Sequence, residues 1–454
     1  MSARWALAFL LLLVRGVARA QEPPQDETPP EQPEPLDDRM KALDERVDQL
    51  EHVVVRRTPR LTISGFIDGG FFASQGDGSG VVQDSGPASA RRFPADSERF
   101  AWVFLGDLLS PAVNTRGEPA DLGNLPGVVR YDPIASHGAL SFIANEVNLR
   151  LRASVADAAL ATASVSFAPR SGSDFRFGDA FEVELAQLEW MLGQSRKTSI
   201  FFGKIDPVIG IEYRERKSDR RFGITPSLIA RYTTGTPVGL KLRSKVGEGD
   251  WLILAAALTN GSSGIETFHF FDDVDSNSGK TGSARLAVAP VLPFLLEVGA
   301  SGEAGPQDRA LDSGDLLWFV GADLRVGVGG FLLKAEWLHG HGAGERDGRY
   351  ADPHRPYGLD LHSGGYAELD WSLGRWGVLA RGEHRDARVW LGNPALPTGG
   401  DRLYITKVWR ATLGARFMLS DFAVLKVEYL HNGEYGGLPN IANDVFTSSL
   451  VLVY

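Results

Sequence analysis

The final stretch of the chain, Asn443–Tyr454, constrains the fold more than any other segment. Counted back in steps of two from the last residue, one face carries Leu452, Leu450 and Phe446. This alternation predicts a β-strand about as long as the 9–11 residues with which a tilted strand crosses a bilayer. Lipid cannot satisfy the hydrogen-bonding groups of an open strand edge. We therefore expect this strand to pair with the first strand of its sheet and close a barrel, the alternative being an ordinary sandwich strand.

The composition excludes several classes of protein. The chain has no cysteine, so disulfides and thiolate sites are excluded. The formal charge of −10 is opposite to the basic surface of a general nucleic-acid binder. Beyond the N-terminus, no window has the ~20 apolar residues of a membrane-spanning helix. No H-E-x-x-H, G-x-S-x-G or P-loop motif occurs, so the sequence indicates no enzyme, metal site or cofactor.

The first 57 residues divide into three segments. Residues 1–20 resemble a secretory signal peptide, with a short apolar core and a small-x-small cleavage site at Ala18-Arg19-Ala20. Residues 21–35 are rich in proline and glutamate and predict a disordered linker. Residues 36–57 predict a periplasmic coiled-coil helix that sets the register of a trimer; the alternative is a single amphipathic helix. Its heptad seam is Leu36, Met40, Leu43, Val47, Leu50 and Val54.

Residues 60–454 predict an all-β, up-and-down antiparallel barrel of about 16 strands that crosses a membrane. Short and long connections alternate, as they do in barrels with turns on one side and loops on the other. The short ones are Val155–Ala159, Leu192–Lys197, Val246–Asp250, Pro290–Pro293, Val326–Gly330, Leu373–Gly377 and Ser420–Asp421. The long ones follow strands that end near Ser74, Ala168, Asp206, Thr259, Glu303, His339, Asp386 and His431. The first long loop, 75–138, has room for an extra hairpin or helix at Phe100–Leu109.

Alternation within the strands separates a charged face from an apolar face, which predicts a wet lumen. The predicted lumen-lining bases are Arg150, Arg152, Lys241, Arg243, Lys245, Arg381, Arg410 and Arg416. Acids share these faces: Glu146, Glu184, Glu297, Asp323, Glu336, Glu368, Asp370 and Glu383. Aromatic residues near the short turns or the C-terminus predict a girdle at one membrane interface. They are Trp190, Trp251, Phe294, Phe331, Trp371, Trp376, Phe417, Phe422 and Tyr454.

The third long loop contains the most charged stretch of the chain, Glu212–Arg221. If this loop folds into the lumen, its bases form the pore constriction and bind anions through planar guanidinium groups. The alternative is a solvated outer loop. The candidate constriction residues are Arg214, Arg216, Lys217, Arg220, Arg221 and, before the loop, Lys204.

Two short motifs resemble the phosphate-selective porin O/P family. One is the opening strand Ile63–Phe71 with its I-S-G-F start, and the other is Gly203-Lys204 followed by Gly210-Ile211-Glu212. The resemblance covers the layout of residues 36–454 and implies a trimeric, sixteen-stranded channel that favours anions or passes small solutes. The aromatic end at Tyr454 is similar to the signal that the barrel-assembly machinery reads.

These observations predict an outer-membrane porin of a Gram-negative bacterium, with its stalk in the periplasm, for passive diffusion of small hydrophilic solutes. Expected partners are lipid or lipopolysaccharide, two further copies of the chain, the assembly machinery and, for the stalk, peptidoglycan; nucleic acid is not among them. Alternatives are a dicarboxylate or sugar channel, a plugged structural or adhesive barrel, and, third, a barrel enzyme.

Overall fold

The computed structural model describes residues 61–74, 82–83, 100–101, 140–167, 181–264, 278–306, 316–343, 358–391, 402–435 and 444–454. The predicted signal peptide, linker and coiled coil lie outside these residues, so they stay predictions. In the described ranges, no helix has both the length and the apolar character to cross a membrane.

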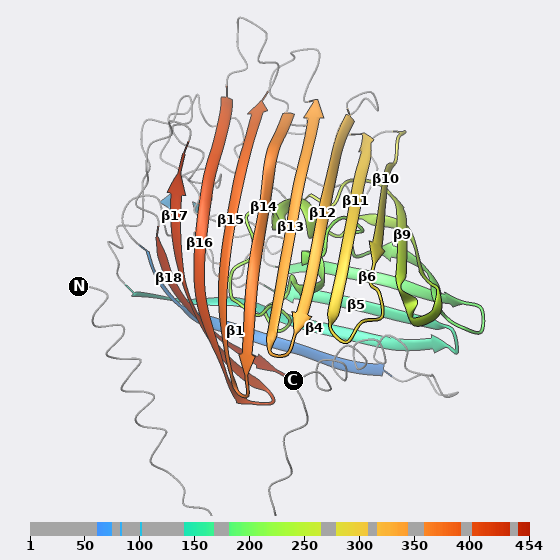
Figure 1. The fold of residues 1–454 in the computed structure, drawn as a ribbon, viewed down its shortest axis with the longest axis horizontal. Helices are drawn as coiled ribbons and strands as arrows, with labels where there is room; N and C mark the ends of the chain where they lie inside the picture. Colours follow the sequence, from blue (N-terminus) through green and yellow to red (C-terminus); the bar gives the residue numbers. More distant parts are fainter. Residues whose placement is uncertain are drawn as a thin grey trace, which may run out of the picture.

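Sixteen strands form one closed antiparallel barrel, which confirms the predicted fold (Figure 1). The first half comprises β1 (Leu61–Ser74), β4 (Leu140–Ala156), β5 (Ala159–Phe167), β6 (Phe181–Leu192), β7 (Thr198–Lys204), β8 (Val238–Val246), β9 (Leu252–Thr259) and β10 (Thr281–Val288). The second half comprises β11 (Leu295–Pro306), β12 (Leu316–Val328), β13 (Phe331–Ala343), β14 (Gly358–Leu373), β15 (Trp376–Leu391), β16 (Arg402–Ser420), β17 (Ala423–Glu434) and β18 (Val445–Val453).

The connections follow the predicted alternation of short and long. Each of the seven predicted short turns lies between two consecutive barrel strands. Two of them turn at Gly329 and Gly374, whose φ of +56° is a left-handed conformation that residues with a Cβ rarely adopt. In the first long connection, β2 (Val82–Gln83) pairs with β3 (Phe100–Ala101), so the expected extra element begins as a short hairpin strand; the rest of Phe100–Leu109 lies outside the described residues.

The terminal strand closes the barrel against β1, as expected. Gly65 and Tyr454 exchange two backbone hydrogen bonds of 3.0 Å, and the Tyr454 hydroxyl donates to the carbonyl of Asn148 at 3.1 Å. A Cβ at Gly65 would lie 2.1 Å from that same carbonyl oxygen, so this position requires glycine. The closing seam therefore depends on a close approach of three strands.

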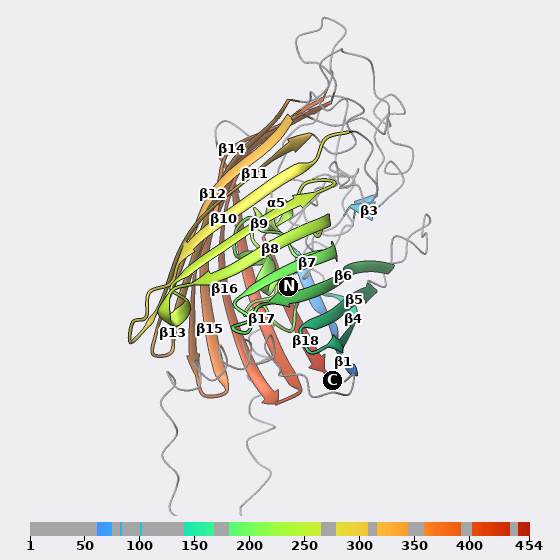
Figure 2. The same ribbon diagram turned by 90° about the vertical axis from the view of Figure 1, so that its right-hand side faces the viewer.

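The strand faces are inverted relative to a soluble barrel. On β8, Leu240 and Leu242 point outward and are exposed, while Lys241 between them points inward and is buried. The aromatic residues of the predicted girdle are exposed or half-buried. The wall is uneven: β7 to β10 have 7–9 residues, whereas β14 to β16 have 16–19 (Figure 2). The apolar surface is thus on the outside and the charged surface on the inside.

Candidate functional site

The segment between β7 and β8, residues 205–237, lies inside the ring of strands; we call it the inner loop. It contains two short helical turns, η4 (Glu212–Glu215) and α5 (Ala230–Thr233). Figure 2 shows α5 within the barrel. The loop contacts inward side chains of strands on opposite sides of the ring, such as Arg150 of β4 and Glu336 of β13. It is therefore the element that shapes the lumen at this level.

Apolar side chains draw the inner loop into the barrel. Residues such as Ile205, Ile209, Leu228 and Ile229 are almost fully buried, although they belong to a connection and not to a strand. Tyr232 packs on Phe319 of β12, with 5.7 Å between ring centroids. Burying one such side chain contributes roughly 1.5–3 kcal/mol. These isoleucine and leucine residues are the sequence signal for a loop that folds inward. The charged stretch Glu212–Arg221 did not give that signal, because it also suits a solvated outer loop.

Three lumen glutamates bind backbone N–H groups of the inner loop. Glu336 of β13 accepts from the N–H groups of Ile211 and Glu212, at 3.0 and 3.1 Å. Glu383 of β15 accepts from Leu228 at 2.7 Å. Glu428 of β17 accepts from the N–H groups of Ile224 and Thr225, at 2.5 and 3.0 Å, and from the Thr225 hydroxyl at 2.7 Å. These three acids therefore accept hydrogen bonds from the inner loop, which occupies the place that water of the lumen would take.

Bases on the same wall bind carbonyl groups of the inner loop. Lys426 of β17 donates to the carbonyls of Ser218, Arg221 and Gly223 at 2.5–2.9 Å. Two predicted lumen bases also do this: Arg381 donates to the carbonyl of Thr225 at 2.8 Å, and Arg410 to that of Pro226 at 2.7 Å. Both arginines point into the lumen but are covered by the loop and buried.

Most bases of Glu212–Arg221 are paired inside the barrel. Arg216 bonds Asp206 at 2.9 Å, and Lys217 pairs with Glu146 at 2.6 Å and with Glu184. Arg221 donates to backbone carbonyls of the loop itself. Arg214 forms a two-bonded pair with Glu297 of β11, with both bonds at 3.0 Å.

Arg220 differs from its neighbours because its side chain is exposed. Its guanidinium has no hydrogen bond or ion pair with any described residue, although Arg150 and Asp219 lie near it. Lys204, at the end of β7, is half-buried and has a partner of its own. A role of these bases in a constriction or in anion binding stays a prediction.

Burial and pairing shift the pKa values of acids in the inner loop. Burial opposes ionisation of Asp206, but Arg216 and Lys241 outweigh it and lower the pKa of Asp206 below its ordinary value. Burial likewise opposes ionisation of Asp219, yet the two bonds from Arg150, at 2.7 and 2.9 Å, lower the pKa of Asp219. For Glu212, burial prevails and raises the pKa, against hydrogen bonds from Ser227.

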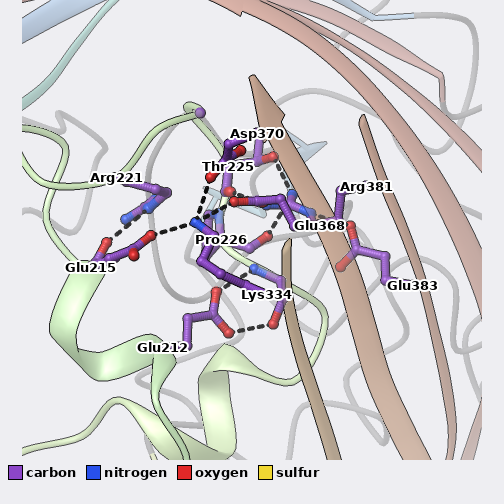
Figure 3. A network of polar contacts seen from close by, with 12 residues as sticks. Glu212, Glu215, Arg221, Thr225, Pro226, Lys334, Glu368, Asp370, Arg381 and Glu383 are labelled. Atoms are coloured by element: carbon purple, nitrogen blue, oxygen red, sulfur yellow. Dashed lines mark hydrogen bonds and ion pairs between the residues drawn. The ribbon is translucent and has the colours of Figure 1, made fainter. Parts of the chain in front are cut away.

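The loop and the β13–β15 wall meet in one polar network, drawn in Figure 3. The Lys334 ammonium lies 2.6 Å from Glu215, 2.5 Å from Glu368 and 3.0 Å from Asp370. Arg381 then links Glu368 to Glu383, at 3.0 Å from each. Lys334, which the strand pattern did not single out, thus neutralises acids that were predicted to line the lumen.

The opposite wall, β4 to β9, keeps bases that reach water. Arg243 of β8 is half-buried beside Glu189 at 3.3 Å, and its guanidinium lies 5.1 Å from the centre of the Phe201 ring. Arg150, Arg152 and Lys245 are also half-buried on the inward face. On β9, Ala255 lies directly across from Arg243 in the strand register and is half-buried. We call the inward face of β4 to β9 the open wall. Arg416, on β16, instead stacks on Phe222 of the loop at 3.7 Å.

Among the described residues, no three histidine or acidic side chains lie close enough together to hold a metal ion.

No protein-family model matches the chain, and no curated protein matches it significantly. The resemblance to the phosphate-selective O/P family thus stays a prediction. Solved structures with a similar fold are outer-membrane proteins. OmpT of Vibrio cholerae (trimer form) has 10% identity and a TM-score of 0.47 over 87% of this chain and 100% of its own. The outer membrane channel DcaP of Acinetobacter baumannii has 11% identity and a TM-score of 0.48 over 88% and 99%. OmpF of Salmonella typhi, in complex with daunomycin, has 11% identity and a TM-score of 0.49 over 87% and 97%. Likeness at this level assigns no function.

Proposed function

We propose that the chain is an outer-membrane porin through which small hydrophilic solutes diffuse passively, with a preference for anions. The closed barrel with an apolar outside and a charged inside supports the membrane location, because a barrel leaves no backbone edge exposed to lipid. Under this proposal the chain is a trimer in a Gram-negative outer membrane, contacts lipopolysaccharide, is inserted through its Tyr454 strand, and carries its stalk in the periplasm, where it reaches peptidoglycan.

The observation that carries the anion preference is the unequal exposure of lumen charges. The side chains of Glu297, Glu368 and Glu383 are 5%, 5% and 0% exposed. Those of Arg214, Arg243 and Arg150 are 31%, 25% and 18% exposed. The acids that pair with these three arginines, Glu297, Glu189 and Asp219, are 5%, 8% and 10% exposed. Two acids of the inner loop, Asp206 and Glu215, are 30% and 26% exposed. At these three pairs a solute therefore meets more of the guanidinium group than of the carboxylate.

The same geometry sets the strength of the selection. A unit charge 4 Å from another interacts with about 1 kcal/mol in water and with about 4 kcal/mol near a protein surface. Partial neutralisation by the buried acids reduces this further. We therefore expect a preference for anions over cations of several-fold, not exclusion of cations, and a steady decline of the preference as salt screens the charges.

A plugged structural barrel is the second candidate, and the inner loop favours it. The loop fills the lumen beside β13 to β17, where inward side chains such as Arg385, Arg410 and Glu428 are at most 2% exposed. The open wall favours the channel, since four of its five inward bases, Arg150, Arg152, Arg243 and Lys245, are only half-buried and Lys241 alone is buried. A phosphate, a dicarboxylate and a sugar channel would differ in the solute that permeates or that blocks the current.

The test is the reversal potential of the refolded protein in a planar bilayer under a KCl gradient. The porin proposal predicts discrete conductance steps and a reversal potential on the chloride side of zero. Steps with a cation-favouring potential would contradict the anion preference. Folded protein that gives no steps would contradict the channel and favour the plugged barrel.

A further inference from the structure

Arg325 of β12 has far fewer partners than its donor groups allow. A guanidinium has five N–H donors. Arg325 contacts one described group, an oxygen of Glu297 at 3.5 Å, and its side chain is 19% exposed. Neighbouring Arg285, by contrast, makes three bonds of 2.5–2.9 Å to Glu297 and Asp323. Arg325 is thus a partly buried cation that points into the lumen, and most of its N–H donors have no partner among the described residues.

Arg214 of the inner loop lies beside Arg325 because both bind the same carboxylate oxygen. Its Nη1 donates to Oε2 of Glu297 at 3.0 Å, the oxygen that Arg325 also contacts. Glu297 and Asp323 are almost completely buried, so they fix three guanidinium groups without offering negative charge to the lumen. Within this group of five side chains, three arginines face two acids, which leaves the group one net positive charge.

Arg214 and Arg325 line one polar cavity of about 20 Å³ between η4 and the wall. A space of this size holds one water molecule, or one oxygen atom of a larger group. Three acids also line the cavity, and each of them already has a partner: Lys334 binds Glu215 and Glu368, and Glu212 accepts from Ser227. The remaining two cations are used as well, because Arg381 binds Glu368 and Arg221 binds backbone carbonyls. The unused donors at this cavity therefore come from Arg214 and Arg325.

We propose that Arg325 and Arg214 form a binding site for a small oxyanion, a carboxylate or a phosphate, one oxygen of which enters this cavity. Paired N–H donors of a guanidinium match two oxygens of such a group, which a lysine cannot reproduce. Glu297 and Asp323 are positioning residues that fix the fork. The site deepens the proposed function, because it specifies where the channel retains anions.

The test is calorimetric titration of the refolded full chain in detergent with inorganic phosphate and, separately, with acetate. We expect saturable binding of at least one anion, about tenfold weaker binding in Arg325→Gln, and an intermediate loss in Arg325→Lys, which keeps the charge but not the fork. Arg416→Gln, on β16, is the matched control and should bind as the original chain does. Which anion binds decides between a phosphate and a carboxylate ligand.

Three results would overturn the site: no binding of either anion, unchanged binding in Arg325→Gln, or equal losses in Arg325→Gln and Arg416→Gln. Heat-modifiable migration on a gel shows whether each variant has folded. The reversal potential separates this proposal from the channel itself. An anion-favouring channel without phosphate or acetate binding refutes the site alone, whereas binding by a chain that never conducts refutes the channel alone.

Discussion

Replacing Glu428 with alanine should release the inner loop from the wall of the barrel. The change removes the acceptor of three donors, the N–H groups of Ile224 and Thr225 and the Thr225 hydroxyl. A buried donor without a partner costs about 1–3 kcal/mol. At the low end, because water can enter the lumen, the three together destabilise the docked loop by about 3 kcal/mol. This corresponds to roughly a hundredfold more of the undocked form.

Limited proteolysis with trypsin measures this release directly. The loop offers cleavage sites after Arg214, Arg216, Lys217, Arg220 and Arg221. Where reclosing is faster than cleavage, the rate follows the population of the open form. Glu428→Ala should therefore be cut about a hundredfold faster, at these sites. Glu189→Gln is the control, because Glu189 binds Arg243 of the wall. Equal cleavage of Glu428→Ala and the original chain would refute the clamping role of the glutamates.

Three further predictions concern pH, closure and the stalk. Asp206 and Asp219 have lowered pKa values, so they stabilise the docked inner loop above pH 3.8, their ordinary pKa, and lose this effect as the pH falls below it. Current noise should therefore rise at low pH, and it should rise less in a variant with Asn at both positions. The raised pKa of Glu212 acts in the opposite sense. Gly65→Val should prevent closure against Tyr454, seen as loss of the heat-modifiable band. Deletion of Leu36–Val54 should lower the thermal stability of the oligomer; an unaltered melting temperature would contradict the trimer stalk.

The barrel could be predicted from sequence because its signals are local. Period-two alternation, as in Leu240, Lys241 and Leu242, fixes each strand and its faces, and the short turns fix the order of pairing. Closure followed from the last strand, which pairs with β1. Each of these features depends on residues that are neighbours in the chain.

The charge arrangement in the lumen could not be predicted in the same way. Glu428 and Ile224 are far apart in sequence, so nothing local indicates that this acid serves a loop and not the pore. Arg325 was not among the predicted lumen bases, although it lies two residues after Asp323 and so on the same face of the strand. Its shortage of partners depends on where Glu297 and Arg285 lie in space. Pairing across the lumen, and not composition, decides which charges a solute meets.

The most direct test of the account uses the absence of cysteine from the chain, since one introduced thiol is then unique. Ala255→Cys places it on the open wall, and Thr412→Cys on the wall covered by the inner loop, where Thr412 is 1% exposed. A negatively charged, membrane-impermeant thiol reagent is added while single-channel current is recorded. We expect the reagent to react quickly with Ala255→Cys and reduce its current, and to leave the current of Thr412→Cys unchanged. Rapid block of Thr412→Cys with no effect on Ala255→Cys would contradict it.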